Sequence, residues 1–336
     1  MKIAVDAMGG DSGLRSTVPG AVQAARENDV NVVFVGEKEK IQAEIRRLSL
    51  EDPRLSIVDA PEAVGMGDHV FAVRRKKRSS IRVGVQLVKD GGADAFVSMG
   101  NTAAVVYMSR SVMGTLQGVN KPALSLILPA LKGNTLLLDV GANANCQPED
   151  LVQFAVMGKV FMEQVMDCIN PRIALMSIGE EEGKGNELTK EAFERLSSTS
   201  LNFIGNVEGK DLYSGKAEVI VSDGFTGNVA LKVSEGVVET LFHMARREIT
   251  KNFFAKIGLF LMKGHLKRIY KRVDYSEYGG AQLLGLNGVC VIGHGRSNST
   301  AVKNAVRLAR DFVAKRVQDK IREELGRAAA PGEAKA

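Results

Sequence analysis

MKIAVDAMGGD, residues 1–11, joins a short apolar run to a polar turn that contains two glycines. The run fits a strand buried on both faces, as in a parallel sheet. Similar apolar runs recur at 31–36, 54–60, 95–100, 134–142, 172–179, 203–208 and 217–224. Helical patterns lie among them at 16–28, 37–48, 80–90, 102–115, 149–167 and 187–197. This alternation predicts an α/β fold around a mainly parallel sheet.

Polar turns with glycine follow most of these runs. They cover residues 6–11, 100–102, 139–145, 178–187, 205–211, 222–228 and 293–297. Ligands of open α/β sheets bind at the carboxyl ends of the strands. Glycine turns expose backbone N–H groups, and a helix that follows adds its positive dipole end, so such turns hold anions. Seven of them predict one shared site for an anion such as phosphate.

The side chains of the turns are mostly neutral donors. Asparagine occurs in them at Asn101, Asn143, Asn145, Asn186, Asn206 and Asn228. Each is either an ordinary turn former or a donor to an oxyanion. Lys184, in EEEGKGNE, is either a solvated loop lysine or a phosphate ligand. His294, in GHG, is either a site residue or a structural one, and Cys146 is expected to be a packing residue.

The sequence lacks the motifs of several common enzyme classes. The sequence has neither the P-loop pattern nor GxGxxG after the first strand, which counts against P-loop kinases and standard dinucleotide folds. Ser222-Asp223-Gly224 is not a GxSxG elbow. The four histidines are scattered, and the three cysteines have no paired spacing, so neither a metal nor a disulfide is expected.

The bulk composition is that of a soluble globular protein. The chain has 336 residues, 45% of them hydrophobic, and a net charge of +6. No apolar run reaches the roughly 18 residues that span a bilayer, and the start lacks the apolar region of a signal peptide. We expect a cytoplasmic protein without a nucleic-acid module.

The turns resemble those of one family, the bacterial phosphate acyltransferases known as PlsX. The matching stretches run through almost the whole chain: AVDAMGGD (4–11), AVRRKK (72–77), SMGNT (98–102), LLLDVGAN (136–143), KGNELTK (184–190), NFIGNVE (202–208), SDGFTGNVALK (222–232), YGGAQLLGL (278–286) and GHGRS (293–297). Departures include Ala103, where family members commonly have glycine, and Gly293 and Arg296 around the histidine.

The resemblance implies a fold and a reaction. The fold is a three-layer α/β/α sandwich, similar to isocitrate and isopropylmalate dehydrogenases and to phosphotransacetylase. The reaction moves a long-chain acyl group from acyl carrier protein to inorganic phosphate, and the acyl phosphate feeds phosphatidic acid synthesis. A homodimer is implied, without metal or organic cofactor. Rival readings are a phosphotransacetylase-like enzyme that uses acyl-coenzyme A, and a non-catalytic membrane-bound scaffold for the carrier.

The motifs assign roles to particular residues. Lys184 and Asn228 are the expected catalytic residues, neutralising phosphate or the oxyanion and donating a hydrogen bond to it. Phosphate and substrate binding are expected of Asp6, Gly9, Gly10, Asp11, Asn101, Thr102, Asn143, Asn186, Asp223, Gly224, Gly227 and His294. Phosphate is itself the nucleophile, so no catalytic triad is needed.

Two basic clusters are candidates for docking the acidic carrier, or are simply solvated faces. The first is Arg74, Arg75, Lys76, Lys77 and Arg78, and the second is residues 246–272. On a helix, the apolar residues of the second cluster fall within an arc of about 120°; they are Phe253, Phe254, Ile257, Phe260 and Leu261. Beyond Gly264 the apolar positions move to another face, which predicts a bend or a hairpin.

This segment is expected either to pack in the dimer or to insert into anionic lipid. Family members are peripheral membrane proteins, so the resemblance implies association with the inner face of the cell membrane. It also implies delivery of the product to a membrane glycerol-3-phosphate acyltransferase. The expected organisation is one catalytic domain over residues 1–326, with a protruding helical tip at 240–275 and a disordered tail at 327–336.

Overall fold

The computed structural model describes residues 1–69, 71–251, 258–259, 261–262, 264–265 and 279–329. Its strands are β1 (Lys2–Asp6), β2 (Asn31–Gly36), β3 (Leu55–Asp59), β4 (Ala95–Ser98), β5 (Ala123–Pro129), β6 (Asn134–Leu138), β7 (Ile173–Met176), β8 (Phe203–Val207), β9 (Val219–Val221), β10 (Ala281–Leu284) and β11 (Val289–Ile292). Its helices are α1 (Leu14–Asn28), α2 (Lys38–Arg47), α3 (Ala72–Arg75), α4 (Ser80–Lys89), α5 (Thr102–Met113), α6 (Pro148–Val165), α7 (Glu187–Ser197), η1 (Gly209–Tyr213), α8 (Gly224–Lys251), α10 (Ser299–Ala314) and α11 (Val317–Ala329).

All the strands join one sheet, in the order β3-β2-β1-β4-β11-β10-β5-β6-β9-β7-β8. Successive side chains of a strand enter opposite cores: Ile3 and Val5 of β1 face one core, and Ala4 faces the other. The first core packs against α1, α2, α6, α7, α10 and α11, and the second against α3, α4, α5, η1 and the start of α8. The three-layer α/β/α prediction is therefore confirmed.

The sheet contains two parallel sets that run in opposite directions. The pairs β10–β11, β10–β5 and β5–β6 are antiparallel. The strands β3, β2, β1, β4 and β11 are mutually parallel, and so are β6, β9, β7 and β8. Three reversals between the sets leave them antiparallel. The ladder nonetheless places Leu138, the end of β6, level with Ser125 and Gln282, and so with Val291 near the end of β11. The carboxyl ends of the two sets therefore meet near the middle of the sheet. The turns that follow the two sets thus approach each other, and their union in one shared site stays a prediction.

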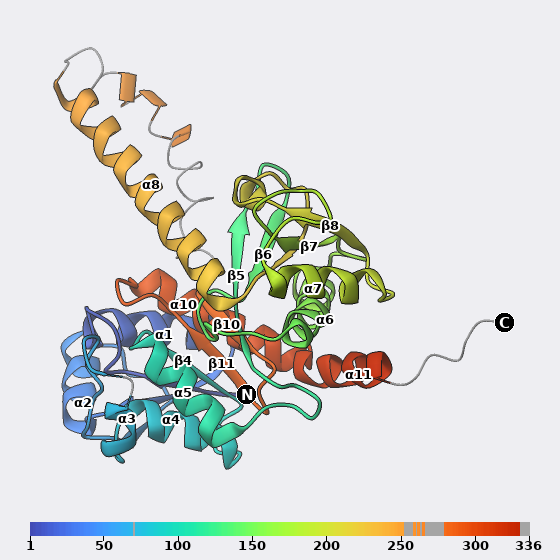
Figure 1. The fold of residues 1–336 in the computed structure, drawn as a ribbon. Coiled ribbons are helices and arrows are strands. Elements are labelled where there is room, and N and C mark those ends of the chain that lie inside the picture. Colours follow the sequence, from blue (N-terminus) through green and yellow to red (C-terminus); the bar gives the residue numbers. More distant parts are fainter. Residues whose placement is uncertain (70, 252–257, 260, 263, 266–278, 330–336) are drawn as a thin grey trace.

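The helix α8 connects the two sets. It follows β9 and projects from the body of the molecule as a long rod (Figure 1). Its middle passes the 293–297 turn after β11, where Arg296 Nη1 lies 3.5 Å from Glu239 Oε1. Polar turns from both sets thus lie along one helix.

The expected tip and tail are only partly described. The helix α8 continues without a break through residue 240 to Lys251. Phe253, Phe254, Ile257 and Phe260 lie outside the described residues, whereas Leu261 is described and 75% exposed. The helix α11 continues to Ala329, so residues 327–329 are helical rather than part of a tail. Within the described residues, no helix is both long enough and apolar enough to cross a membrane.

Candidate active site

A cleft of about 570 Å³ opens where three helices begin, at the carboxyl ends of the second parallel set. It is lined by Ala144, Asn145, Cys146, Gln147, Asn186, Leu188, Asp223, Phe225 and Thr226. Gln147 is the N-cap of α6, Asn186 is the N-cap of α7, and Asp223 precedes α8. Three positive dipole ends therefore point at one cleft, which is the electrostatic arrangement that favours an anion.

The α7 side of the cleft is ordered by its cap. The Asn186 side-chain oxygen accepts a hydrogen bond from Thr189 N–H at 2.9 Å. The preceding residue, Gly185, has φ +112°, and a Cβ there would come within 2.8 Å of Ser177 Oγ. Only glycine fits this position, and its conformation turns the chain from the Lys184 loop into α7.

The α8 side is fixed by Asp223. One carboxylate oxygen accepts from Phe225 N–H and Thr226 N–H, both at 2.9 Å, and the other accepts from Thr226 Oγ1 at 2.7 Å. Gly224 N–H donates to the Asn143 carbonyl at 2.8 Å. Asp223 is therefore a helix cap, and its negative charge lines the cleft.

Behind the cleft, Asp139 organises the turn after β6. Its carboxylate accepts from the N–H groups of Leu124, Gly141, Ala142 and Asn143, and from Asn143 Nδ2, at 2.8 to 3.0 Å. Burial raises the pKa of Asp139, and the hydrogen bonds oppose that rise. Sequence reasoning placed Asp139 in a turn but gave it no role. A sequence signal for this role was present: Asp139 directly follows the apolar run of β6 and lies two residues before Gly141.

Two lysines lie close to the cleft, and they differ in what they pair with. The buried carboxylate of Asp150 is neutralised by Lys121 Nζ at 2.9 Å, and this lysine also donates to the Asn145 carbonyl at 2.8 Å. Lys184 is exposed and forms no ion pair with any residue that the structure describes. A phosphate in the cleft would meet the charge of Asp223, so a nearby ammonium is needed to balance it.

The expected catalytic residues lie next to the cleft rather than in its lining. Lys184 is two residues before Asn186, on the loop between β7 and α7. Asn228 is exposed on the second turn of α8, where its side chain faces Gly141: a Cβ on this glycine would lie 3.5 Å from Asn228 Cγ. Asn143 is buried behind the cleft, where its Nδ2 donates to the Pro122 carbonyl at 2.7 Å.

Other expected site residues form a second group, in the first parallel set. Asp6 is buried and accepts from Ser98 Oγ at 2.7 Å, and desolvation raises its pKa. Asn101 caps α5 through Ala104 N–H, directly before Thr102, and its Nδ2 donates to the carbonyls of Met66 and Asp68 at 3.1 Å. These contacts organise turns. Gly9 and Gly10 pack there: a Cβ on Gly9 would come within 2.7 Å of Asp6 Oδ2, and one on Gly10 within 3.1 Å of the Gly295 carbonyl.

His294 joins this group to α8. Asp11 N–H donates to the Gly295 carbonyl at 2.8 Å, which ties the first turn to the 293–297 turn. Desolvation lowers the pKa of His294, with Glu235 and Lys232 of α8 acting in opposite directions. His294 therefore interacts electrostatically with α8 from the 293–297 turn, and it lies outside the cleft lining.

The first basic cluster is largely occupied by contacts within the chain. Lys76 Nζ pairs with Asp68 at 2.8 Å, and Arg78 pairs with Asp59 at 2.9 Å. The Arg74 guanidinium lies 5.7 Å from the ring centroids of both Phe71 and Tyr107. Arg75 and Lys77 are exposed, and neither takes part in an ion pair within the described residues.

Comparison with known proteins places the chain in a family. Residues 1–320 match the model of a family described as fatty acid synthesis protein. A phosphate acyltransferase of Thermodesulfovibrio yellowstonii is 45% identical over 325 residues, which cover 97% of this chain and 94% of the relative. One of Geotalea daltonii is 47% identical over 326 residues, with the same coverage. A phosphotransacetylase structure from Streptococcus pyogenes covers 94% of both chains, with a TM-score of 0.65 at 19% identity.

The structural likeness at this low identity bears on the fold alone, and it confirms the predicted phosphotransacetylase-like architecture. The sequence relatives bear on the activity, because their identity is high and extends over nearly the whole chain. The chain therefore belongs to the phosphate acyltransferase family and is an acyltransferase.

Proposed function

We propose that the chain transfers a long-chain acyl group from acyl carrier protein to inorganic phosphate and supplies acyl phosphate for phosphatidic acid synthesis. The observation that carries the proposal is the convergence of α6, α7 and α8 on one cleft through their N-termini. A phosphate held there needs no nucleophilic side chain, because one of its own oxygens attacks the thioester carbon. The C–S bond breaks, the electron pair leaves with sulfur, and the thiolate takes up the proton released by phosphate.

Lys184 and Asn228 are the proposed catalytic residues. Lys184 lies on the loop that leads to the α7 cap, so its ammonium can reach an anion at that helix end. Asn228 lies on the turn of α8 that follows the cleft residues Phe225 and Thr226, and its amide can donate to the developing oxyanion. Together they supply one charge and one neutral donor beside Asp223.

The proposed acyl donor is a carrier protein rather than coenzyme A. The support is the motif resemblance together with the exposed cations of the α3 region, Arg75 and Lys77, which an acidic carrier would meet. Coenzyme A remains the second candidate because the fold is shared with a phosphotransacetylase.

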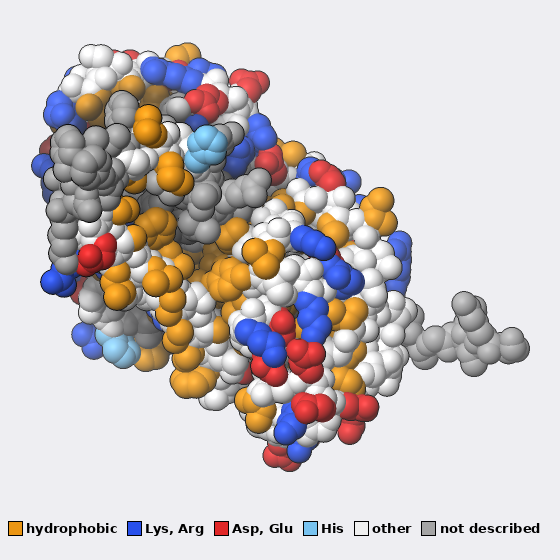
Figure 2. Space-filling model, turned by 90° about the horizontal axis from the view of Figure 1, so that it is seen from above, with side chains coloured by type: hydrophobic (Ala, Val, Ile, Leu, Met, Phe, Trp, Pro, Cys, Tyr) orange, Lys and Arg blue, Asp and Glu red, His pale blue; other side chains and the backbone are white. Residues whose placement is uncertain are grey.

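A homodimer is part of the proposal, and α8 is its proposed contact. Beyond the cleft residue Phe225, large apolar side chains recur every four residues on this helix and are about half to three-fifths exposed: Val229 48%, Val233 59%, Val237 52% and Leu241 60%. Hydrophobic side chains also gather over the middle of the face seen from above (Figure 2). A two-fold contact between such helices would bury the same stripe on both copies.

We also propose peripheral association with the inner, cytoplasmic face of an anionic membrane. Beyond α8, the described Leu261 and Met262 are 75% and 54% exposed, and the sequence around them is rich in lysine and arginine. The product would pass there to a membrane glycerol-3-phosphate acyltransferase. Replacing Phe253 and Phe260 with glutamate should release the protein from anionic vesicles and spare its activity on soluble substrate. Unchanged vesicle binding would refute the membrane proposal.

The function is tested with purified protein, palmitoyl-carrier and inorganic phosphate, with acyl phosphate trapped by hydroxylamine as the hydroxamate. We expect hydroxamate that depends on phosphate and on the carrier thioester. Activity with palmitoyl-coenzyme A alone would favour the phosphotransacetylase-like alternative. Carrier binding without any product would indicate a scaffold.

A further inference from the structure

The loop that carries Lys184 is held by its main chain at two points. Lys184 N–H donates to the Glu181 carbonyl at 3.0 Å, which closes a tight turn within the loop. The Lys184 carbonyl accepts from Ser177 Oγ at 3.2 Å. Both backbone groups of the proposed catalytic lysine are therefore fixed, although its side chain is exposed.

A second donor reaches the same Glu181 carbonyl. Asn206 Nδ2, at the end of β8, donates to it at 3.0 Å. Asn206 is only 4% exposed, and its side-chain oxygen is buried without a hydrogen-bond partner in the described part of the chain. Leaving a buried acceptor unpaired costs stability, so a position that served folding alone would not favour asparagine over an apolar residue.

We propose that Asn206 is the positioning residue for Lys184, an inference that rests on the proposed function. By sharing the Glu181 carbonyl with Lys184 N–H, Asn206 fixes the turn that carries the Lys184 side chain. Ser177, directly after the neighbouring strand β7, donates to the Lys184 carbonyl. Residues at the ends of β7 and β8 thus position the Lys184 side chain through hydrogen bonds to two main-chain carbonyls, those of Lys184 and Glu181.

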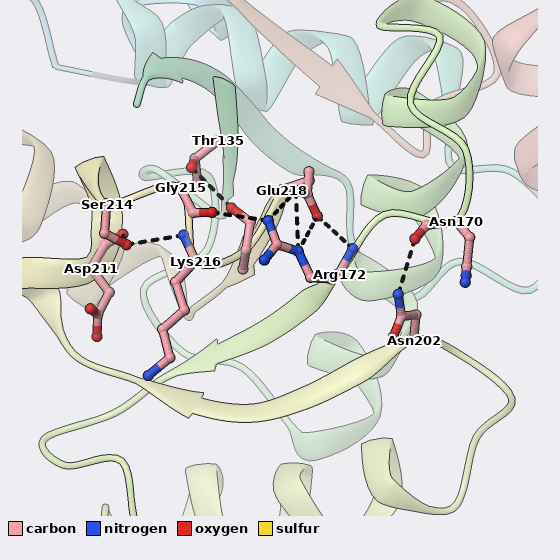
Figure 3. Close-up of polar contacts among 10 residues, drawn as sticks. Thr135, Asn170, Arg172, Asn202, Asp211, Ser214, Gly215, Lys216 and Glu218 are labelled. Carbon is pink, nitrogen blue, oxygen red and sulfur yellow. Dashed lines mark hydrogen bonds and ion pairs between the residues drawn. The ribbon is translucent and has the colours of Figure 1, made fainter. Parts of the chain in front are cut away.

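The chain contains a matched control for this contact. Asn202, directly before β8, donates from Nδ2 to the Asn170 carbonyl at 3.0 Å, the same type of bond at the other end of the strand (Figure 3). The same close-up shows Arg172 paired with Glu218, a clamp next to the start of β7. Asn202→Ala therefore removes an equivalent hydrogen bond at the end of β8 remote from Lys184.

The first test is a double-mutant cycle on turnover, using whichever thioester the wild-type protein accepts. Asn206→Ala should lower kcat by about tenfold, since a small misplacement of a catalytic group has such effects, whereas Asn202→Ala should change kcat less than about twofold. Adding Asn206→Ala to Lys184→Ala should cause little further loss, because the lysine it positions is already absent. The proposal would be overturned if the double variant lost kcat by the full product of the two single losses. Normal turnover of Lys184→Ala would overturn it as well.

The second test does not depend on activity. Amide hydrogen exchange of residues 181–186 should be faster in Asn206→Ala than in wild type and unchanged in Asn202→Ala. Asn206→Leu, which keeps a similar volume and carries neither a donor nor a buried acceptor, should behave like Asn206→Ala and serves if the alanine variant does not fold. Equal exchange in all variants would show that the Asn206 hydrogen bond does not hold the Lys184 loop. A wild-type protein that forms no acyl phosphate would instead contradict the proposed function. The exchange experiment would still show whether Asn206 holds the Lys184 loop.

Discussion

Gly227 of α8 packs directly against the main-chain carbonyl of Asp139, so closely that a Cβ at position 227 would overlap this oxygen. One turn earlier, Gly224 N–H donates to the Asn143 carbonyl. These contacts join the start of α8 to the turn that the Asp139 carboxylate folds. The cleft thus depends on two glycines that let a helix approach a buried turn.

Gly227→Ala should therefore open this junction. We expect a loss of about 2 kcal/mol in the free energy of unfolding, as for overpacking of a core, and a large loss of turnover. Gly236→Ala is the matched control on the same helix, because no described atom lies within 4 Å of its Cβ position. It should gain up to about 1 kcal/mol from helix propensity. Chemical denaturation measures both, and equal stabilities of the two variants would contradict the packing argument.

Lys184→Ala and Asn228→Ala should each lower kcat by about two to three decades, the usual effect of removing one donor to an oxyanion. Both side chains are exposed, so folding should be retained. Lys190→Ala, an exposed lysine of α7, is the control and should keep wild-type turnover. Near-normal rates for both site variants would remove them from the mechanism.

The stability should depend on pH through His294. Desolvation lowers the pKa of this imidazole below its ordinary value of 6.5. The unfolded state then binds the proton first, so stability is full above about pH 6.5 and falls as the pH drops toward the folded pKa. His294→Gln should remove this contribution to the loss of stability at acidic pH. Glu235 raises the pKa of His294, so Glu235→Gln should lower it further, as an NMR titration would measure. A pKa at or above 6.5 in the wild type would be inconsistent with this account.

The oligomeric state should depend on the exposed stripe of α8. Val233→Glu and Leu241→Glu place charges among its apolar side chains and should yield a monomer by light scattering. Arg246→Glu, exposed on another face of the same helix, should leave the mass unchanged. A dimer that tolerates both stripe substitutions would place the contact elsewhere.

Much of the fold followed from the sequence because buried parallel strands are apolar and end in polar turns. The eight predicted strand runs correspond to β1–β4 and β6–β9. The strand β5 was missed, and with it the reversal of direction. Strand direction is set by pairing between distant segments, such as Ser125 with Gln282, and no local pattern records it.

The cleft was predictable in its residue types and less so in its geometry. Asn186 and Asp223 were assigned from motifs and do line it. Asp6 and Asn101 come from similar turns but organise the other parallel set. Asn206 bonds to the carbonyl of Glu181, and Asp139 accepts from Leu124 N–H as well as from its own turn. Contacts such as Asn206–Glu181 and Asp139–Leu124 join separate strands, so they exist only once the chain has folded.

The most direct test of the central claim is a crystal structure of the protein with inorganic phosphate. We predict phosphate in the cleft between the first turns of α6, α7 and α8, beside Asn186 and Thr226, with the Lys184 ammonium directed at it. Phosphate bound instead at the 293–297 turn beside Arg296, with this cleft empty, would contradict the account.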